Sequence, residues 1–315
     1  MTKRFPTRSA AALACVEPDR RWLVEGLWAE GAVGIVGGEP KCCKSFLALD
    51  VAVSVAAARP CLGRFSVPRP GRVLLFAAED AQHVVRERLE GIALARGTSL
   101  EELDVEVITT PVVRLDLAGD RERLGQTIAE LAPRLLVLDP FVRLHRIDEN
   151  ASGEVAPLLA FLRELNRKHD LAVLLVHHAK KGASAARAGQ ALRGSSEFHA
   201  WGDSNLYLTR RGSSLQLVVE HRAAPSIPPL HVELAETAGG LALRPVEALT
   251  CSTEVAPPSA AERVLETLRD ATGPLRVAQL RSRCRMRTQS LVDALRELTD
   301  RELVEHTADG YCARG

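Results

Sequence analysis

Five short apolar runs, each followed by a segment of a different character, most strongly limit the folds open to this chain. The runs lie at 32–38, 71–80, 104–110, 134–140 and 171–178. Strands that are apolar throughout are typical of parallel sheets covered on both faces. The four segments between these five runs, at 44–58, 82–96, 120–132 and 152–170, have the length and spacing of helices. The pattern therefore predicts an α/β fold with a mostly parallel sheet and helices on both of its faces.

The rest of the chain follows other patterns. "SNLYLTRR" and "LQLVVEHR" flank a Gly-Ser-Ser turn, and "HVELAET" and "LALRPVE" flank a Gly-Gly pair, so we expect two β-hairpins after the sheet. The tail shows three amphipathic segments and two short strands, which is typical of a winged helix-turn-helix. The predicted organisation is a flexible N-terminus at 1–20, the α/β domain at 21–249, a linker at 250–260 and the winged helix-turn-helix domain at 261–315.

Composition excludes several classes of protein. The net charge is only +1, so affinity for nucleic acid must come from local basic patches. The seven cysteines are scattered without a Cys-x-x-Cys pair, which argues against a disulfide framework or a zinc site. No run approaches the about 18 apolar residues of a membrane span. The apolar part of the first residues is too short to be the apolar region of a signal peptide. We expect a cytoplasmic protein with reduced thiols and no membrane partner.

The stretch "GIVGGEPKCCKS" (34–45) resembles a phosphate-binding loop between a strand and a helix. Such a loop gathers backbone N–H groups at a helix N-terminus, where the helix dipole favours anions. It also supplies a lysine for the β- and γ-phosphates and a hydroxyl for Mg²⁺, here Lys44 and Ser45. The residues expected to bind nucleotide are Gly38, Glu39, Pro40, Lys41, Cys42, Cys43, Lys44, Ser45 and Phe46.

Cys43 occupies the position where the Gly-x-x-x-x-Gly-Lys-Ser pattern has its second glycine. If this position requires a left-handed backbone, a residue other than glycine costs about 1–2 kcal/mol. A thiol at a helix N-terminus beside Lys44 is also expected to be acidified. Two hypotheses follow: that Cys42 or Cys43 makes nucleotide binding sensitive to oxidation or alkylation, or that both are inert small residues.

Polar side chains follow three of the predicted strands. Asp139 ends "LLVLD" and is placed to hold Mg²⁺ together with Ser45. "FAAED" ends in Glu79 and Asp80, of which Glu79 is preferred as the base that orients the attacking water. "LLVHH" ends in His177 and His178, either of which can sense the γ-phosphate, and neither has metal-ligand spacing.

Two basic segments are candidates for contact with nucleic acid. The segment 179–196 carries basic residues and no acid, so it suits the backbone of a single strand, although a solvated loop is the alternative. The tail segment 276–287 is rich in arginine and falls where a helix-turn-helix meets DNA, although a winged helix that binds protein is the alternative. The predicted contact residues are Lys180, Lys181, Arg187, Arg193, Arg281, Arg283, Arg285 and Arg287.

Taken in order, "GIVGGEPKCCKS", "LLFAAED", "LVLDPF", "DEN" and "LLVHHAKKG" resemble the RecA-like ATPases of the RepA hexameric replicative-helicase group, which are kin to the DnaB core. The resemblance covers roughly residues 20–235. It implies a RecA-like fold, hydrolysis of ATP with Mg²⁺, and a homo-oligomeric ring, in this group a hexamer, that acts on single-stranded DNA. It places the family's lysine on Lys44, its glutamate on Glu79 and its sensor histidine on His177 or His178. Of the two histidines, we assign His178 to catalysis and His177 to nucleotide binding.

The resemblance also implies a basic finger inserted from a neighbouring subunit. "VVEHRAAP" resembles the Lys-x-Arg stretch of the DnaB core, which places the finger on Arg222, with Glu220 where the family has lysine. An arginine supplied in trans stabilises charge on the γ-phosphate.

Three functions remain open from the sequence. The first is a DNA-dependent ATPase of the helicase class, which the resemblance connects with plasmid or mobile-element replication. The second is a nucleotide-gated DNA-binding regulator with slow or no hydrolysis, in which Cys43 marks the loss of turnover. The third is a recombinase- or clock-type RecA relative. In the first, the tail binds duplex DNA or a replication partner, and in the second, the winged helix binds DNA under the control of the nucleotide.

Overall fold

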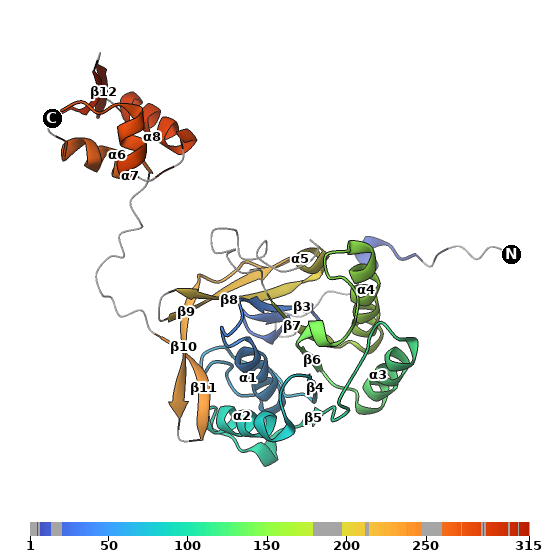
Figure 1. Ribbon diagram of the computed structural model, residues 1–315. Helices are drawn as coiled ribbons and strands as arrows, with labels where there is room; N and C mark the ends of the chain where they lie inside the picture. Colours follow the sequence, from blue (N-terminus) through green and yellow to red (C-terminus); the bar gives the residue numbers. More distant parts are fainter. Residues whose placement is uncertain are drawn as a thin grey trace. The chain divides into compact units, whose positions relative to one another are not determined.

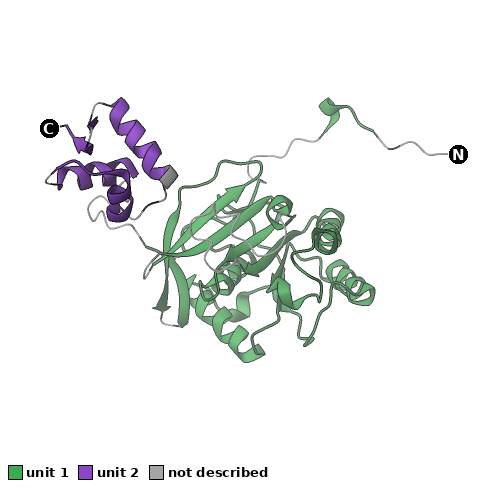
Figure 2. Ribbon diagram, turned by 45° about the horizontal axis from the view of Figure 1, so that its top comes forward, with its two compact units in different colours: residues 1–247 green, residues 248–315 purple. Residues whose placement is uncertain are grey.

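The computed structural model describes residues 5, 7–13, 21–178, 197–211, 214–237, 239–246, 260–271, 273–284, 286, 288–301, 303–307 and 309–314. The chain divides into two compact units, residues 1–247 and 248–315 (Figure 2). The predictions for 179–196, Arg285 and Arg287 lie outside the described residues, as does most of the expected linker.

One sheet of nine described strands organises the first unit, in the order β11-β10-β9-β8-β3-β7-β6-β4-β5. The strands from β8 to β5 in this order run parallel, and the three pairs from β8 to β11 are antiparallel. The expected α/β fold with a mostly parallel sheet is thus confirmed. The bounds are β3 (Val33–Gly38), β4 (Val73–Ala77), β5 (Val105–Val107), β6 (Leu135–Asp139), β7 (Ala172–His178), β8 (Ser204–Arg211), β9 (Ser214–His221), β10 (Leu230–Thr237) and β11 (Gly240–Pro245).

Helices cover both faces of the parallel strands (Figure 1). One hydrophobic core joins one face of the sheet to α1 and α2, and a second core joins the opposite face to α3, α4 and α5. Strands buried on both faces need apolar side chains at successive positions, which explains the unbroken apolar runs of the sequence. The helices are α1 (Lys44–Ala57), α2 (Gln82–Ala95), α3 (Ala118–Leu131), α4 (Ser152–His169) and α5 (Glu197–Trp201).

Several short elements were not expected from the sequence. They are a pair of strands, β1 (Trp22–Val24) and β2 (Trp28–Ala29), and the 3-10 helices η1 (Ala10–Ala12), η3 (Leu100–Glu102) and η4 (Phe141–Arg143). Elements of two or three residues are too short to show a hydrophobic period. Trp28 is nevertheless fully buried, and its indole N–H donates to the carbonyl of Ala32 at 3.3 Å.

The strand register brings four strand ends to one edge of the sheet. Gly38 at the end of β3 pairs with His178 at the end of β7. Ala77 at the end of β4 pairs with Asp139 at the end of β6. Since parallel strands end at the same edge, the loop after β3 and the residues after β4, β6 and β7 all leave the sheet on one side, where ligands bind in open α/β sheets.

The second unit has its own core. It contains α6 (Ala260–Arg269), α7 (Val277–Cys284) and α8 (Thr288–Asp300), followed by the strand pair β12 (Val304–Thr307) and β13 (Gly310–Ala313). Side chains from all three helices and from β12 are buried together, among them Val264, Leu280, Leu291 and Val304. The expected three helices and strand pair are present, and their interpretation as a winged helix-turn-helix stays a prediction. Within the described residues, no helix is both long and apolar enough to cross a bilayer.

Candidate functional site

The loop between β3 and α1 needs glycine at its first position. Gly38 has φ +153°, and a Cβ there would lie 2.2 Å from the carbonyl oxygen of Leu208 on β8 and 2.7 Å from Cys42 Sγ. Contacts this short with backbone atoms are not tolerated, so only glycine allows β8 to approach the loop.

Two residues of the loop are not glycine and still adopt left-handed backbone angles. Lys41 has φ 64°, and Cys43 has φ 62° and ψ 28°. Cys43 therefore adopts the left-handed backbone that is strained for a residue other than glycine. This conformation costs about 1–2 kcal/mol relative to the right-handed region. Arg210, on β8, donates to the carbonyl oxygen of Lys41 at 3.0 Å and so supports this strained turn from outside the loop.

The expectation that the loop thiols are acidified is wrong. Burial raises the pKa of Cys42 and of Cys43 above the ordinary value, and the positive charges of Lys44 and Arg210 reverse only part of this rise. Cys42 is 1% exposed and Cys43 is half-buried, so desolvation outweighs the nearby charges. Neutral thiols favour the alternative in which both cysteines are inert small residues.

Lys44 opens α1 and points back into the loop. Its Nζ donates to the carbonyl oxygen of Glu39 at 2.7 Å and lies 3.9 Å from Cys42 Sγ. The side chain is buried, and burial lowers its pKa, while Asp139 is one of the groups that oppose this change. A buried ammonium group at the centre of a loop is suited to bind an anion that supplies the missing counter-charge.

Asp139 ends β6 within hydrogen-bond reach of the loop helix. Burial raises the pKa of its carboxyl to about 6, and the hydrogen bond from the Ser45 side chain opposes this rise. A hydroxyl and a carboxylate placed together are the protein ligands that Mg²⁺ takes beside phosphate oxygens, with water completing its shell. The pair fits the ion, and among the described residues no cluster of three or more His, Cys, Asp or Glu offers a different metal site.

A cavity of about 320 Å³ joins these groups at the carboxyl edge of the sheet. It is lined by Lys41, Cys42, Cys43, Lys44, Ser45, Phe46, Glu79, Asp80, Arg88, Asp139, Val176 and His178. The loop, three acids that follow or end β4 and β6, and one histidine of β7 lie far apart in the sequence and thus face a single space.

The two acids after β4 have different partners. Asp80 accepts two hydrogen bonds from Arg88, at 2.6 and 3.0 Å, and Arg88 lies over the ring of Phe46 at 5.2 Å from its centroid. Glu79 accepts one hydrogen bond from Arg143, at 2.8 Å, and its side chain is 42% exposed. Glu79 is therefore less constrained than Asp80, which agrees with its preference as the base.

Only one of the two histidines of β7 lines the cavity. His178 does, whereas His177 is 1% exposed and stacks on Phe198 with ring centroids 4.3 Å apart. Successive residues of a strand point to opposite faces, so the two rings cannot share one site. The position of His177 gives no support to the expectation that it binds nucleotide.

Arg222 is not among the residues that line this cavity. Arg222 follows β9, where it pairs with Asp203 at 3.2 Å near the start of β8, at the edge of the sheet opposite the loop. A finger that acts in a neighbouring subunit has no contact with its own site, so its role stays a prediction. Arg281 and Arg283 are exposed on α7, as a contact to DNA requires.

Three arginines near the loop and its acids were missed from the sequence: Arg88, Arg143 and Arg210. Each lies on an element whose sequence pattern gives no sign of the contact, since an arginine on a helix or a strand is usually solvated.

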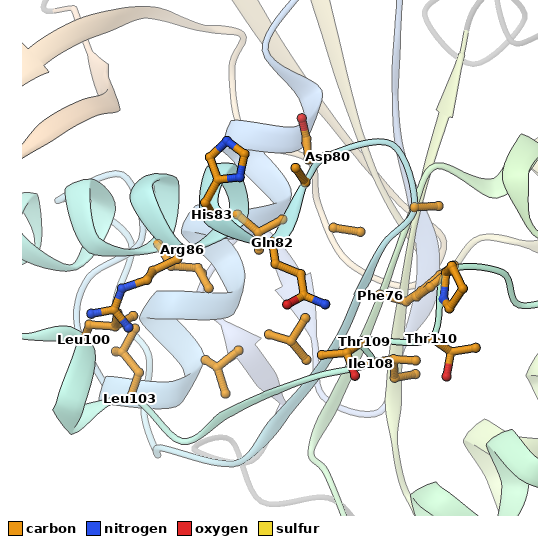
Figure 3. A pocket seen from close by; sticks show the side chains of 18 residues that line it. Phe76, Asp80, Gln82, His83, Arg86, Leu100, Leu103, Ile108, Thr109 and Thr110 are labelled. Carbon is orange, nitrogen blue, oxygen red and sulfur yellow. The ribbon is translucent and has the colours of Figure 1, made fainter.

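A second cavity, of about 620 Å³, lies between α2 and β5 (Figure 3). It is larger but mostly apolar, and its lining includes Asp80 but none of the loop residues. Of these two cavities, only the smaller is lined by Lys44, Ser45 and Asp139, so it is the candidate site for a phosphate group and Mg²⁺.

The family model of AAA domains matches residues 2–184, which is more than half of the chain. The chain belongs to the AAA domain family. The match contains the loop, Glu79, Asp139 and both histidines of β7, so the AAA domain carries every residue that we place at the cavity.

Solved structures show the same fold. The crystal structure of a KaiC-like protein from the hyperthermophilic archaeon Pyrococcus horikoshii matches with a TM-score of 0.50 and 15% identity, over 71% of this chain and 94% of that chain. A DnaB-like replicative helicase, solved with its interactions with primase, matches with a TM-score of 0.52 and 13% identity, over 68% of this chain and 57% of that chain. The AAA domain thus has the fold of RecA-like P-loop ATPases.

Proposed function

We propose that the protein hydrolyses Mg-ATP in the 320 Å³ cavity and that DNA stimulates this hydrolysis, as in a RepA- or DnaB-like ATPase of the helicase class. The observation that supports the proposal most is the convergence of Lys44, Ser45, Glu79, Asp139 and His178 on one space. A phosphate loop alone binds nucleotide, whereas a loop with a metal-side acid and a separate base is equipped for hydrolysis.

The loop residues bind and orient the phosphates. Backbone N–H groups at the start of α1 would donate to the phosphates, and Lys44 would exchange the Glu39 carbonyl for a phosphate oxygen. Ser45 and Asp139 would hold Mg²⁺, which when bound neutralises charge on the phosphates.

Glu79 accepts a proton from the water that attacks the γ-phosphate. Its exposed side chain reaches the cavity, and it is not tied by two hydrogen bonds as Asp80 is. His178 lies at the end of β7 and senses the γ-phosphate, and Arg222 of a neighbouring subunit completes the site in a ring.

DNA is the proposed partner of both units. The likeness to a protein described as a replicative helicase supports single-stranded DNA as the partner of the AAA domain. Exposed Arg281 and Arg283 support contact between α7 and duplex DNA in a winged helix-turn-helix.

One observation favours the second candidate, a nucleotide-gated DNA-binding regulator with slow or no hydrolysis. Cys43 takes a left-handed backbone where glycine is unstrained, so the loop stores strain that a working motor has no evident use for. In this case nucleotide binding, and not turnover, controls the affinity for DNA.

The test is the rate of Mg-dependent ATP hydrolysis with and without single-stranded DNA, for the wild type, Lys44→Ala and Cys43→Gly. The proposal expects hydrolysis that DNA stimulates and that Lys44→Ala abolishes. Tight ATP binding without turnover, with hydrolysis appearing in Cys43→Gly, would replace it with the regulator.

A further inference from the structure

Arg143 contacts Glu79 at the rim of the candidate site. Its Nε donates to Glu79 Oε1 at 2.8 Å. Glu79 follows β4, whereas Arg143 is the last residue of η4, which begins two residues after Asp139. The pair therefore ties the base that we assign to the segment that follows the metal-side acid.

The pair is weak because both side chains remain open to water. Arg143 is 61% exposed and Glu79 is 42% exposed. Exposed ion pairs bias an equilibrium by about fivefold at most. By contrast, the side chains of Arg96 and Asp50, which pair in the same unit, are 5% and 0% exposed, so water and dissolved anions do not reach this pair. The exposed pair is one that a competing anion can open.

The contact opposes the chemistry of the base. A carboxylate oxygen that is held by a guanidinium donor is not free to accept a hydrogen bond from the attacking water. Arg143 is not among the residues that line the 320 Å³ cavity. It therefore acts on the orientation of Glu79 and not on the phosphates of the nucleotide.

The surroundings of Arg143 favour an anionic partner with many charges. Arg146, three residues further on, is also exposed. The acids of this segment contact groups other than Arg143. Glu154 accepts from the N–H of Asp148, Asp148 accepts from Asn150, and Glu149 lies 3.4 Å from His145. A nucleic-acid backbone presents phosphates in a row and competes for arginine better than one carboxylate does.

We propose that Arg143 is a positioning residue that restrains Glu79 in the resting protein, and that a phosphate of single-stranded DNA releases Glu79 by taking its place on Arg143. The inference rests on the proposed function, since it explains how DNA stimulates hydrolysis at this site. It assigns the coupling between DNA binding and ATP hydrolysis to one ion pair, which joins the segment after β4 to the segment after β6.

The first test needs no hydrolysis. The affinity of the full chain for fluorescein-labelled oligo(dT) is measured by anisotropy without nucleotide. Glu79→Gln removes the competing charge and tightens binding by two- to fivefold, and Arg143→Gln weakens it. In the Arg143→Gln background the effect of Glu79→Gln disappears, whereas in the Arg146→Gln background, the matched control, it persists.

An equal gain from Glu79→Gln in the presence and absence of Arg143 would show a general effect of charge and would overturn the proposal. Absence of oligo(dT) binding in every variant would overturn the assignment of DNA as the partner.

The second test measures hydrolysis without DNA. Arg143→Gln raises kcat by two- to fivefold at unchanged KM for ATP, and the stimulation by DNA falls by the same factor. Arg143→Lys, which keeps the charge, lies between Arg143→Gln and the wild type. A fall in kcat for Arg143→Gln would overturn the restraint. If the wild type does not hydrolyse ATP, the proposed function fails, while the binding cycle still decides whether the pair exists as a restraint.

Discussion

The raised pKa of the buried Asp139 carboxyl is what we expect at a site that binds a cation. Its pKa is raised from 3.8 to about 6, chiefly by burial, so the folded protein binds this proton more tightly than the unfolded chain. The contribution of Asp139 to the stability of the folded protein is therefore fully present below pH 3.8, and it is lost as the pH rises through about 6. Above pH 6 the charged carboxylate destabilises the protein, unless a cation lies beside it.

Asp139→Asn is expected to stabilise the metal-free and nucleotide-free protein at pH 7.5, by up to about 3 kcal/mol, because it removes this buried charge. The same change is expected to abolish Mg-dependent nucleotide binding. Urea unfolding measures the first effect. Asp104→Asn, at a half-exposed ion pair with Arg72, is the control and changes stability by less than about 1 kcal/mol. Destabilisation by Asp139→Asn would contradict the assignment.

The loop thiols give a second prediction at this scale. Because burial raises the pKa of Cys42 and of Cys43, their alkylation by iodoacetamide is expected to be slow at pH 7.5 and to accelerate only above pH 9. Mass spectrometry of the labelled peptide measures the rates, and the urea-unfolded chain is the reference. Fast labelling of the folded protein at pH 7 would show thiolates at the loop.

The sequence predicts those site residues that end an apolar run, such as Asp139 and Glu79, because the end of a parallel strand fixes their place. It does not choose between His177 and His178, because alternation along β7 decides only after the register with β3 is known. The pair of Arg143 and Glu79 joins residues 64 positions apart, and no local pattern signals it.

At the scale of elements, the long helices and the buried strands follow the hydrophobic pattern closely. The strand predicted at 104–110 is shorter, at Val105–Val107, because the chain turns away after it has paired with β4. The short pair β1 and β2 was missed. The hydrophobic pattern does not predict the polar contacts that join one element to another, because these contacts are made between residues that are far apart in the sequence.

Arg96 is the clearest of these contacts. Its guanidinium, at the end of α2, donates to both carboxylate oxygens of Asp50 on α1 and to the carbonyl oxygen of Leu243 on β11. Arg96→Met leaves the fully buried Asp50 charge without its cation, so a loss of about 3–5 kcal/mol is expected in urea unfolding. The control Arg244→Met removes an exposed partner of Glu233 on the same hairpin and costs less than about 1 kcal/mol. Equal effects of the two changes would contradict this account.

At the scale of the whole molecule, each unit has its own core. The second unit is expected to unfold in a transition of its own, since each core cluster of described residues draws its members from one unit. Binding of Mg-ATP is expected to raise the midpoint of the first unit only, because a ligand stabilises the unit that binds it. Calorimetry with and without nucleotide measures both transitions, and a shared shift would show that the units unfold together.

The central claim is that the cavity at the carboxyl edge of the sheet hydrolyses Mg-ATP with Glu79 as the base. The most direct measurement compares ATP affinity and single-turnover hydrolysis for the wild type and Glu79→Gln. We predict that Glu79→Gln binds Mg-ATP as tightly as the wild type and hydrolyses it at least about 100-fold more slowly. Hydrolysis by Glu79→Gln at the rate of the wild type would contradict the claim.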